Sequence, residues 1–269
     1  MKTFLADGFR NVDSVSDAKK ILRCLSFMDD LPDFRAYKEL SIDTLNLCQN
    51  SRVADLACGL GFDLLRLHRR APNGYVVGFD ISNELVVAAR QYTSGHDNVE
   101  VIQSDALHLE AEDQYFDAVR IDRSLQHIES PRNVVSEMVR VTKAGGFVSA
   151  SEPDWASFHI ACDYQDLMRI ALNEWISSFK NPFIGVSIVD IMSEQRLEIC
   201  HHFVETIFVR NWHEADVVFD IGETIRRCAE KGVIEKTKAD SLMENMLERH
   251  LSGRFFARLC IHTVTGRTK

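Results

Sequence analysis

The segment from Val53 to Asp63 constrains the fold of this chain more than any other. It reads V-A-D-L-A-C-G-L-G-F-D, an apolar run with one acid that leads into two glycines separated by a single residue. A second apolar run, Y-V-V-G-F, ends in Asp80. A buried strand, a glycine turn and a helix bring backbone N–H groups close to a ligand, and an acid after the next strand reaches ribose hydroxyls. The pairing therefore predicts an α/β fold with a site for a nucleoside-containing cofactor.

Strand and helix patterns alternate five times between residues 52 and 152. Short apolar runs predict strands, and amphipathic stretches between them predict helices. The predicted strands are Arg52–Ala57, Tyr75–Phe79, Val99–Gln103, Phe116–Ile121 and Phe147–Ala150, with helices at Phe62–Arg70, after Ser82 and after Ser130. Such alternation indicates a doubly wound, mostly parallel sheet with both faces covered by helices.

The rest of the chain predicts additions to this core. We expect helices at Ser14–Asp29, Pro32–Leu47, Asp163–Phe179, Val186–Arg196 and over much of 213–250, and strands at Glu198–Val209 and Phe255–Val264 that complete a seven-stranded sheet. The expected organisation is one domain over 1–269, with N-terminal helices (1–50), a cofactor-binding core (51–152) and helical cap insertions at 154–182 and 211–252. Loops at the carboxyl ends of such strands cover the ligand crevice.

Composition excludes several classes of protein. The net charge of −9 opposes binding to a phosphate backbone, so nucleic acid is an improbable partner and a small-molecule substrate is favoured. No apolar run approaches the roughly 20 residues that span a membrane, and the N-terminal apolar run meets charged residues too early for a signal peptide. The seven cysteines form no C-x-x-C pair, which is typical of reduced thiols in a cytoplasmic protein.

The residues in and around the glycine turn distinguish between the possible classes of nucleotide cofactor. A dinucleotide fingerprint needs a third small residue, where this chain has Leu64, and the acid Asp55 would repel a pyrophosphate. No G-K-[ST] follows, which excludes a Walker phosphate loop. These features favour a ligand that has a ribose and no phosphate.

Five motifs in order then resemble class I S-adenosylmethionine-dependent methyltransferases, of the small-molecule, ubiquinone/menaquinone methyltransferase-like group. V-A-D-L-A-C-G-L-G is similar to the family motif V-L-D-x-G-C-G-x-G, with Ala57 in place of the first glycine. The other four are F-D-I-S at 79–82, Q-S-D-A at 103–106, F-D-A-V-R-I-D-R-S-L-Q-H at 116–127 and V-T-K-A-G-G-F at 141–147. The resemblance implies a Rossmann-like methyltransferase fold.

The resemblance also implies a set of cofactor-binding residues. They are Asp55, Ala57, Cys58, Gly59, Gly61, Asp80, Ile81, Asp105, Ala106, Asp122 and Arg123. Asp80 would bind the ribose hydroxyls, and Ile81 would pack on the adenine. Asp105 would accept from the adenine amino group, and Arg123 would pair with the methionine carboxylate. Asp55 and the turn would lie along the methionine part.

Candidates for acceptor chemistry follow the fourth and fifth strands. His127 is the first choice as a general base, supported by the resemblance, with Glu152, Asp154 and His159 as others. Trp155, Phe158 and His159 are candidate substrate contacts. No metal site is expected, because the spacing at 159–163 fits no zinc pattern.

Structural roles remain open for several of these residues. His127 can equally satisfy backbone groups at a helix end. Pro153 can mark a turn that prevents further strand pairing. Lys38, with Arg35, can lie over the cofactor carboxylate, but a solvated helix face is the favoured interpretation. Cys58 is expected to be a packing residue and not a nucleophile.

The predicted function is transfer of a methyl group from S-adenosylmethionine to an O, N or C atom of a small molecule, by in-line displacement that leaves S-adenosylhomocysteine. The alternatives are an RNA or protein methyltransferase, a non-catalytic S-adenosylmethionine-binding module and, least favoured, a nicotinamide-dependent oxidoreductase. The sequence leaves open whether the chain forms a homodimer.

Overall fold

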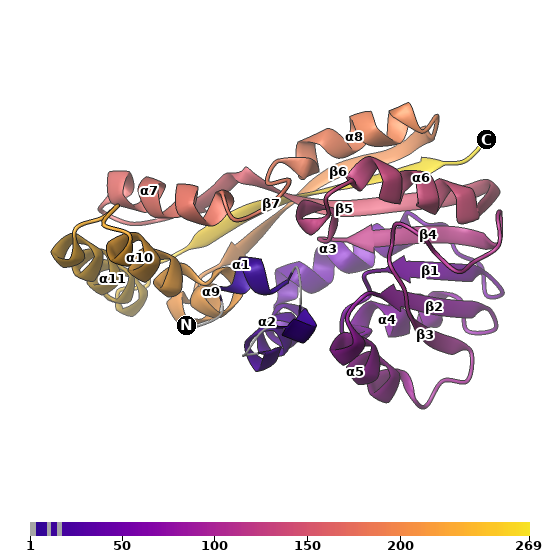
Figure 1. The fold of residues 1–269 in the computed structure, drawn as a ribbon, viewed down its shortest axis with the longest axis horizontal. Coiled ribbons are helices and arrows are strands. Elements are labelled where there is room, and N and C mark those ends of the chain that lie inside the picture. The colour runs from indigo at the N-terminus through magenta and orange to yellow at the C-terminus, as the bar shows by residue number, and fades with distance from the viewer. Residues whose placement is uncertain (1–3, 10–11, 15–17) are drawn as a thin grey trace.

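The computed structural model describes residues 4–9, 12–14 and 18–269, and these residues build a seven-stranded sheet in the order β3-β2-β1-β4-β5-β7-β6 (Figure 1). β7 is antiparallel to both of its neighbours, and the other pairs are parallel. The strands are β1 (Arg52–Leu56), β2 (Tyr75–Asp80), β3 (Val99–Gln103), β4 (Phe116–Asp122), β5 (Thr142–Ile160), β6 (Glu198–Val209) and β7 (Ala257–Arg267). The predicted fold class is confirmed.

Helices cover both faces of the parallel part of the sheet. On one face, α3 (Pro32–Asp43), α4 (Phe62–Arg70) and α5 (Asn83–Thr93) share an apolar cluster with β1 and β2. On the other face, α6 (Pro131–Val141) and α8 (Ile184–Glu194) share a second cluster with β1, β2 and β4. This two-sided burial explains why the strands read as continuous apolar runs and not as alternating ones.

The fifth strand is much longer than the predicted Phe147–Ala150. β5 continues through Pro153 to Ile160 and pairs with β7 on both sides of a register shift between Asp154 and His159. Pairing with β4 ends at Ser151, so beyond this point β5 has a neighbouring strand on one side only. A proline is tolerated on such an edge because no ladder needs its missing N–H. The interpretation of Pro153 as the end of strand pairing was therefore wrong.

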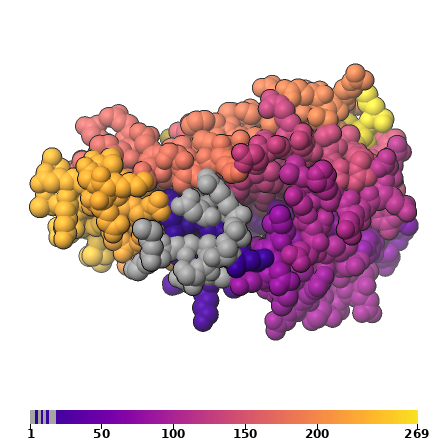
Figure 2. Space-filling view, in the orientation of Figure 1, coloured from indigo at the N-terminus to yellow at the C-terminus, as the bar shows by residue number. Residues whose placement is uncertain are grey.

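The insertion predicted to begin at residue 154 consequently starts as strand and becomes helical only at α7 (Gln165–Ile176). The second insertion contains α9 (Trp212–Phe219), α10 (Ile221–Glu230) and α11 (Lys236–Leu251). We call α7 and α9–α11 the cap. They pack on the long ends of β5, β6 and β7 through one large apolar cluster. In Figures 1 and 2 the cap lies at the opposite end of the molecule from β1–β3.

The N-terminal helices lie between the cap and the core (Figure 1). They are α1 (Leu5–Gly8), a 3-10 turn η1 (Val12–Ser14), α2 (Ala18–Asp30) and α3. Residues 15–17 of the predicted helix Ser14–Asp29 lie outside the described residues. Within the described ranges, no helix has both the length and the hydropathy needed to cross a membrane.

The close contact between α8 and β5 predicts a sensitive glycine. A Cβ atom on Gly185 would lie 2.8 Å from the backbone oxygens of Glu152 and Pro153, whereas one on Gly95 would meet nothing within 4 Å. We expect Gly185→Ala to lower the free energy of unfolding by about 1–3 kcal/mol, because backbone must move. Gly95→Ala should change it by less than about 1 kcal/mol. Denaturant unfolding measures both, and equal values would contradict the close packing.

Candidate active site

The turn after β1 adopts the conformation that its glycines favour. Gly59 and Gly61 have φ of +57° and +78°, and Ala57, which replaces a glycine of the family motif, has φ of +53°. An alanine in this left-handed region costs about 1–2 kcal/mol. The Cys58 side chain fills the space beside Gly78, where a Cβ would lie 2.7 Å from its sulfur. Burial raises the pKa of the Cys58 thiol, which is consistent with packing and not with nucleophilic chemistry.

Asp80 lies at the carboxyl end of β2, where its carboxylate is tied to the turn. Its Oδ2 accepts from the Gly59 N–H at 2.9 Å, and its Oδ1 accepts from the Ser82 N–H at 3.0 Å. Burial raises the pKa of Asp80. The neighbouring Ile81 is 62% exposed, although it lies on the wall of a cavity described below. A large apolar side chain exposed in this way is available to a ligand.

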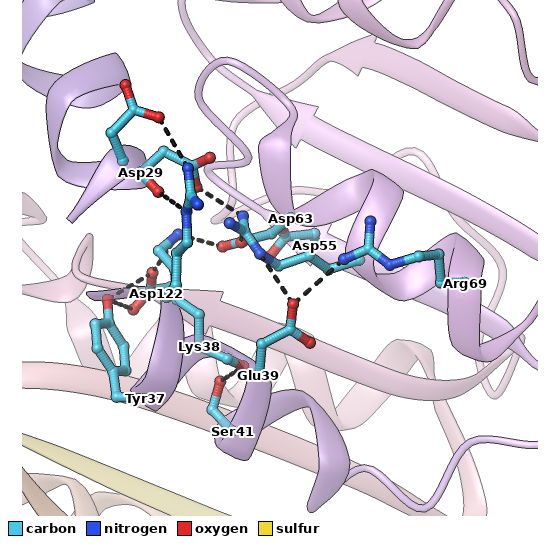
Figure 3. Close-up of polar contacts among 12 residues, drawn as sticks. Asp29, Tyr37, Lys38, Glu39, Ser41, Asp55, Asp63, Arg69 and Asp122 are labelled. Atoms are coloured by element: carbon cyan, nitrogen blue, oxygen red, sulfur yellow. Dashed lines mark hydrogen bonds and ion pairs between the residues drawn. The ribbon is translucent and has the colours of Figure 1, made fainter. Parts of the chain in front are cut away.

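A network of buried charges lies beneath the turn (Figure 3). Arg120 of β4 is 1% exposed, and its Nη1 lies 3.2 Å from Asp55 Oδ1 and 3.0 Å from Asp63 Oδ2. Lys38 of α3 places its Nζ 2.5 Å from Asp63 Oδ2 and 3.2 Å from Asp122 Oδ2. These ion pairs thus connect α3 and β4 with the two acids, Asp55 and Asp63, that lie on either side of the glycine turn.

Lys38 corrects the favoured prediction of a solvated helix face, because it is 8% exposed and faces two carboxylates. Its neighbour Arg35 is exposed and pairs with Asp30. Arg120 and Asp63 were not among the predicted site residues. Arg120 was detectable as a cation flanked by the apolar residues of A-V-R-I in the fourth strand, where a buried charge requires a partner.

The pKa values of the carboxylates in this network are shifted in different directions. Burial raises the pKa of Asp55 to about 7, and the Arg120 charge offsets only part of this effect. Burial also acts to raise the pKa of Asp63, but Lys38, Arg120 and Arg66 outweigh it and hold that pKa well below its usual range. Asp63 is therefore the firmly ionised partner, whereas burial favours the protonated form of Asp55.

The turn after β4 carries the next candidates. Arg123 has φ of +51°, and its guanidinium lies 5.1 Å from the Phe34 ring. The His127 ring lies beside the rings of Phe9 and Phe179, at centroid distances of 5.6 and 5.4 Å. His127 is the last residue of a 3-10 turn, η2 (Leu125–His127). The aromatic neighbours fix the plane of the imidazole.

Glu152 anchors this turn and does not face the cavity. It is fully buried and accepts from the backbone N–H groups of Ser124 and Leu125 at 2.7 and 2.5 Å. Gln126, one residue before His127, accepts from the Trp155 indole at 2.7 Å. Glu152, which was a candidate base together with His127, thus holds the backbone of this turn in place.

A cavity of about 600 Å³ joins most of the predicted residues. Its lining includes Asp55, Ala57, Cys58, Gly59, Asp80, Ile81, Asp105, Ala106, Asp122, Arg123, His127 and Trp155, and also Lys38 and Asp63. Asp105 accepts from the Leu107 N–H at 2.9 Å. The cavity therefore runs from the ends of the parallel strands to the cap.

Besides Glu152, four predicted positions lie outside this lining. Gly61 is the N-cap of α4, and a Cβ atom on it would lie 3.1 Å from the Cβ of Ala89. Phe158 packs on Trp155 and Phe219, and His159 lies beside Phe256. Asp154 accepts from the Ala156 N–H. β5 has a register shift between Asp154 and His159, and the sequence pattern does not reveal such a shift. No three metal-binding side chains converge in the described part of the chain.

A family model described as a methyltransferase domain matches residues 47–203, more than half of the chain. The chain belongs to this family. The methyltransferase is 29% identical over 250 residues to an uncharacterized 37.1 kDa protein in transposon TN4556 of Streptomyces fradiae, covering 90% of this chain and 71% of that protein. It is 28% identical over 147 residues to a demethylmenaquinone methyltransferase of Bacillus licheniformis, covering 52% of this chain and 63% of that enzyme. The matched region is thus less than two thirds of that enzyme's length.

Solved structures share the fold of this methyltransferase. A Bacillus halodurans protein described as a candidate methyltransferase has a TM-score of 0.61 at 19% identity, over 86% of this chain and 97% of that one. A geranyl diphosphate methyltransferase in complex with GPP and sinefungin has a TM-score of 0.54 at 14% identity, over 87% of this chain and 77% of that one. The family match identifies a methyltransferase, and the solved structures show that its fold is that of other methyltransferases.

The anchoring role of Glu152 predicts a pH dependence of stability. Burial raises the pKa of Glu152 to about 8, well above its usual 4.5, so the folded protein holds a proton that the unfolded chain has released. The stabilisation is complete below about pH 4.5 and is lost as the pH rises through 8. Glu152→Gln stays neutral and keeps an accepting oxygen. Relative to this variant, we expect the wild type to lose at least about 1 kcal/mol of unfolding free energy between pH 5 and pH 8.

Denaturant unfolding at several pH values measures this difference. Glu198→Gln, at an exposed position of β6, is the control and should follow the wild-type profile. Parallel profiles for wild type and Glu152→Gln would show that Glu152 is ionised in the folded protein.

Proposed function

We propose that this methyltransferase transfers a methyl group from S-adenosylmethionine to a small molecule held between the core and the cap. The observation that supports the proposal is one continuous cavity with two chemically different ends. The core end carries carboxylates at the tips of parallel strands, and the cap end is apolar. A cationic, phosphate-free nucleoside suits the first, and an organic acceptor suits the second.

The adenosine part fits the residues after β2 and β3. Each Asp80 oxygen accepts one backbone N–H, which leaves further lone pairs for the ribose hydroxyls. The exposed Ile81 would cover one adenine face, with Ala106 beside it. Asp105 would accept from the adenine amino group. The left-handed turn at 57–61 lets the backbone approach without a side chain between.

The methionine part fits the charged network. Asp55, Asp63 and Asp122 surround the inner end of the cavity and favour a cationic sulfonium and an ammonium group. Lys38 and Arg123 line the same region and would attract the cofactor carboxylate. We assign Lys38 to this role because its burial against Asp63 and Asp122 places its ammonium group inside the cavity wall.

When bound, the cofactor supplies a methyl group that is already activated by its positive sulfur. The protein then has to orient the acceptor and exclude water, which is the larger part of the catalytic gain. The rings of Phe9 and Phe179 hold the imidazole of His127 in one plane, and Glu152 holds its turn. We propose that His127 takes a proton from the acceptor as the methyl group arrives.

A small acceptor is favoured over nucleic acid for two reasons. The chain carries a net charge of −9, and the acceptor end of the cavity lies beneath the cap and the N-terminal helices. Residence in the cytoplasm and formation of a homodimer stay predictions from sequence.

The role of Asp80 predicts a loss of cofactor affinity. In Asp80→Asn the ribose hydroxyls lose a charged acceptor, so the Kd for S-adenosylhomocysteine should rise about 10- to 100-fold by calorimetry. Asp117→Asn is the control, since Asp117 pairs with Lys143 near the other end of β4 and should leave Kd unchanged. An unchanged Kd in a folded Asp80→Asn protein would remove Asp80 from the site.

Labelled S-adenosylmethionine tests the function itself. With the wild type in a whole-cell extract, the methyl label should enter the small-molecule fraction that is separated afterwards from protein and nucleic acid. His127→Asn should lower the initial rate about 10²- to 10⁴-fold without changing S-adenosylhomocysteine affinity, because only proton transfer is lost. His201→Asn, on exposed β6, should retain the rate. Label confined to protein or nucleic acid would overturn the small-molecule assignment.

A further inference from the structure

A loop that leads out of the cap lies against the turn that carries His127. Residues 177–183 connect α7 of the cap with α8, and we call them the α7–α8 loop. Asn181 of this loop donates through its Nδ2 to the Leu125 carbonyl at 2.9 Å and to the Ile128 carbonyl at 2.6 Å. These carbonyls belong to residues on either side of His127 in the sequence, so one side-chain amide spans the turn.

The backbone of the α7–α8 loop is bound to the same region. The Asn181 N–H donates to the Gln126 carbonyl at 3.0 Å, and the Trp155 N–H donates to the Pro182 carbonyl at 3.1 Å. The loop is therefore attached to both η2 and β5. Because these two hydrogen bonds are made by the backbone, removal of the Asn181 side chain should loosen the turn without releasing the loop.

Asn181 and Glu152 bind complementary groups of the turn. Glu152 accepts from the N–H groups of Ser124 and Leu125, whereas Asn181 donates to the carbonyls of Leu125 and Ile128. Leu125 is thus held at both its N–H and its carbonyl. Backbone groups that are paired in this way resist rotation, because each rotated peptide would leave a polar group without its partner.

The same loop supplies part of the cavity wall. Phe179 lines the cavity, stacks on Trp155 at a centroid distance of 4.6 Å and lies 5.4 Å from the His127 ring. The α7–α8 loop therefore contacts both the backbone under His127 and an aromatic surface beside it. Precise placement matters here, since a misplacement of about 1 Å can lower an enzymatic rate about 100-fold.

We propose that Asn181 is a positioning residue for methyl transfer, which holds the carbonyls on both sides of His127 and so keeps the imidazole at the cavity wall. Among the described residues that line the cavity, His127 is present and Asn181 is absent, so Asn181 acts through His127. The role of His127 as the base rests on the proposed function. The control of its orientation by Asn181 does not.

Asn98 provides a matched control. Its Nδ2 also donates to two backbone carbonyls, those of Pro72 at 3.0 Å and Gly74 at 2.9 Å. Both asparagines are partly buried, but Asn98 and its two partners lie outside the cavity lining. Alanine at either position removes the same kind of paired hydrogen bond, and only at Asn181 does this pair flank the proposed base.

Kinetics with labelled S-adenosylmethionine in the whole-cell extract test the proposal. Asn181→Ala should lower kcat about 10- to 100-fold, because the imidazole is misplaced. The KM for S-adenosylmethionine and the Kd for S-adenosylhomocysteine should stay within about twofold of wild type. Asn98→Ala should keep kcat within about twofold. An unchanged kcat in folded Asn181→Ala, an equal loss in Asn98→Ala, or a parallel loss of cofactor affinity would overturn the proposal.

A double variant separates an effect through His127 from a general loosening of the site. If Asn181 acts through His127, its removal has no further effect once the imidazole is gone. Asn181→Ala added to His127→Asn should therefore change kcat by less than about twofold. A larger additional loss would show that Asn181 acts on another part of the site.

Nuclear magnetic resonance distinguishes failure of this proposal from failure of the proposed function. The imidazole resonances of His127 should shift in Asn181→Ala and remain in place in Asn98→Ala. These shifts without label in the small-molecule fraction would refute the proposed function and leave the positioning of His127 intact. Label transfer with unshifted His127 resonances would refute only the role of Asn181.

A second substitution keeps the test decisive if Asn181→Ala does not fold. Asn181→Ser retains one hydrogen-bond donor and so can hold one of the two carbonyls. We expect it to lower kcat about 3- to 10-fold and to shift the His127 resonances in the same direction as the alanine variant. Wild-type kcat and unshifted resonances in Asn181→Ser would contradict the proposal.

Discussion

The buried ion pairs around Arg120 determine the shape of the cofactor end. A guanidinium this deeply buried requires charged partners, and Asp55 and Asp63 supply them from β1 and from the first turn of α4. Removing one partner of a buried pair typically costs about 3–5 kcal/mol, because the remaining charge stays desolvated. The glycine turn between the two acids is therefore held at both ends.

Lys38 extends this constraint to the N-terminal helices. Its ammonium joins α3 to Asp63 and to Asp122 at the end of β4, and the Tyr37 hydroxyl donates to Asp122 at 2.9 Å (Figure 3). The same carboxylates face the cavity. Charges that stabilise the fold thus also set the electrostatic potential for a cationic ligand, so that the network serves both stability and binding.

The length of β5 connects the two ends of the cavity. Its first half lies in the parallel core beside β4, and its second half pairs with β7 beneath the cap. Glu152, between the halves, holds the turn of His127, and Trp155 faces the apolar end. One strand therefore positions groups at both the cofactor end and the acceptor end.

Sequence patterns predicted the parallel core well, because its strands and helices are specified by local apolar periodicity and by glycine turns such as Gly59-Leu60-Gly61. They also located the helices of the cap, α7 and α9–α11, but they missed the extension of β5 to Ile160. Nothing local distinguishes Pro153 in an edge strand from Pro153 in a turn, since the difference depends on whether β4 still lies alongside. The register shift between Asp154 and His159 is equally invisible.

The sequence by itself determined the class of fold, the turn after β1 and the acid at Asp80, because each depends on residue type and spacing within a short segment. The tertiary structure decided which charges are buried together and which aromatic rings form the acceptor wall. Lys38 and Asp63 are 25 residues apart, and Trp155 and Phe219 come from different elements, so only the packed chain brings them into contact. Burial then converts ordinary side chains into a charged crevice and an apolar chamber.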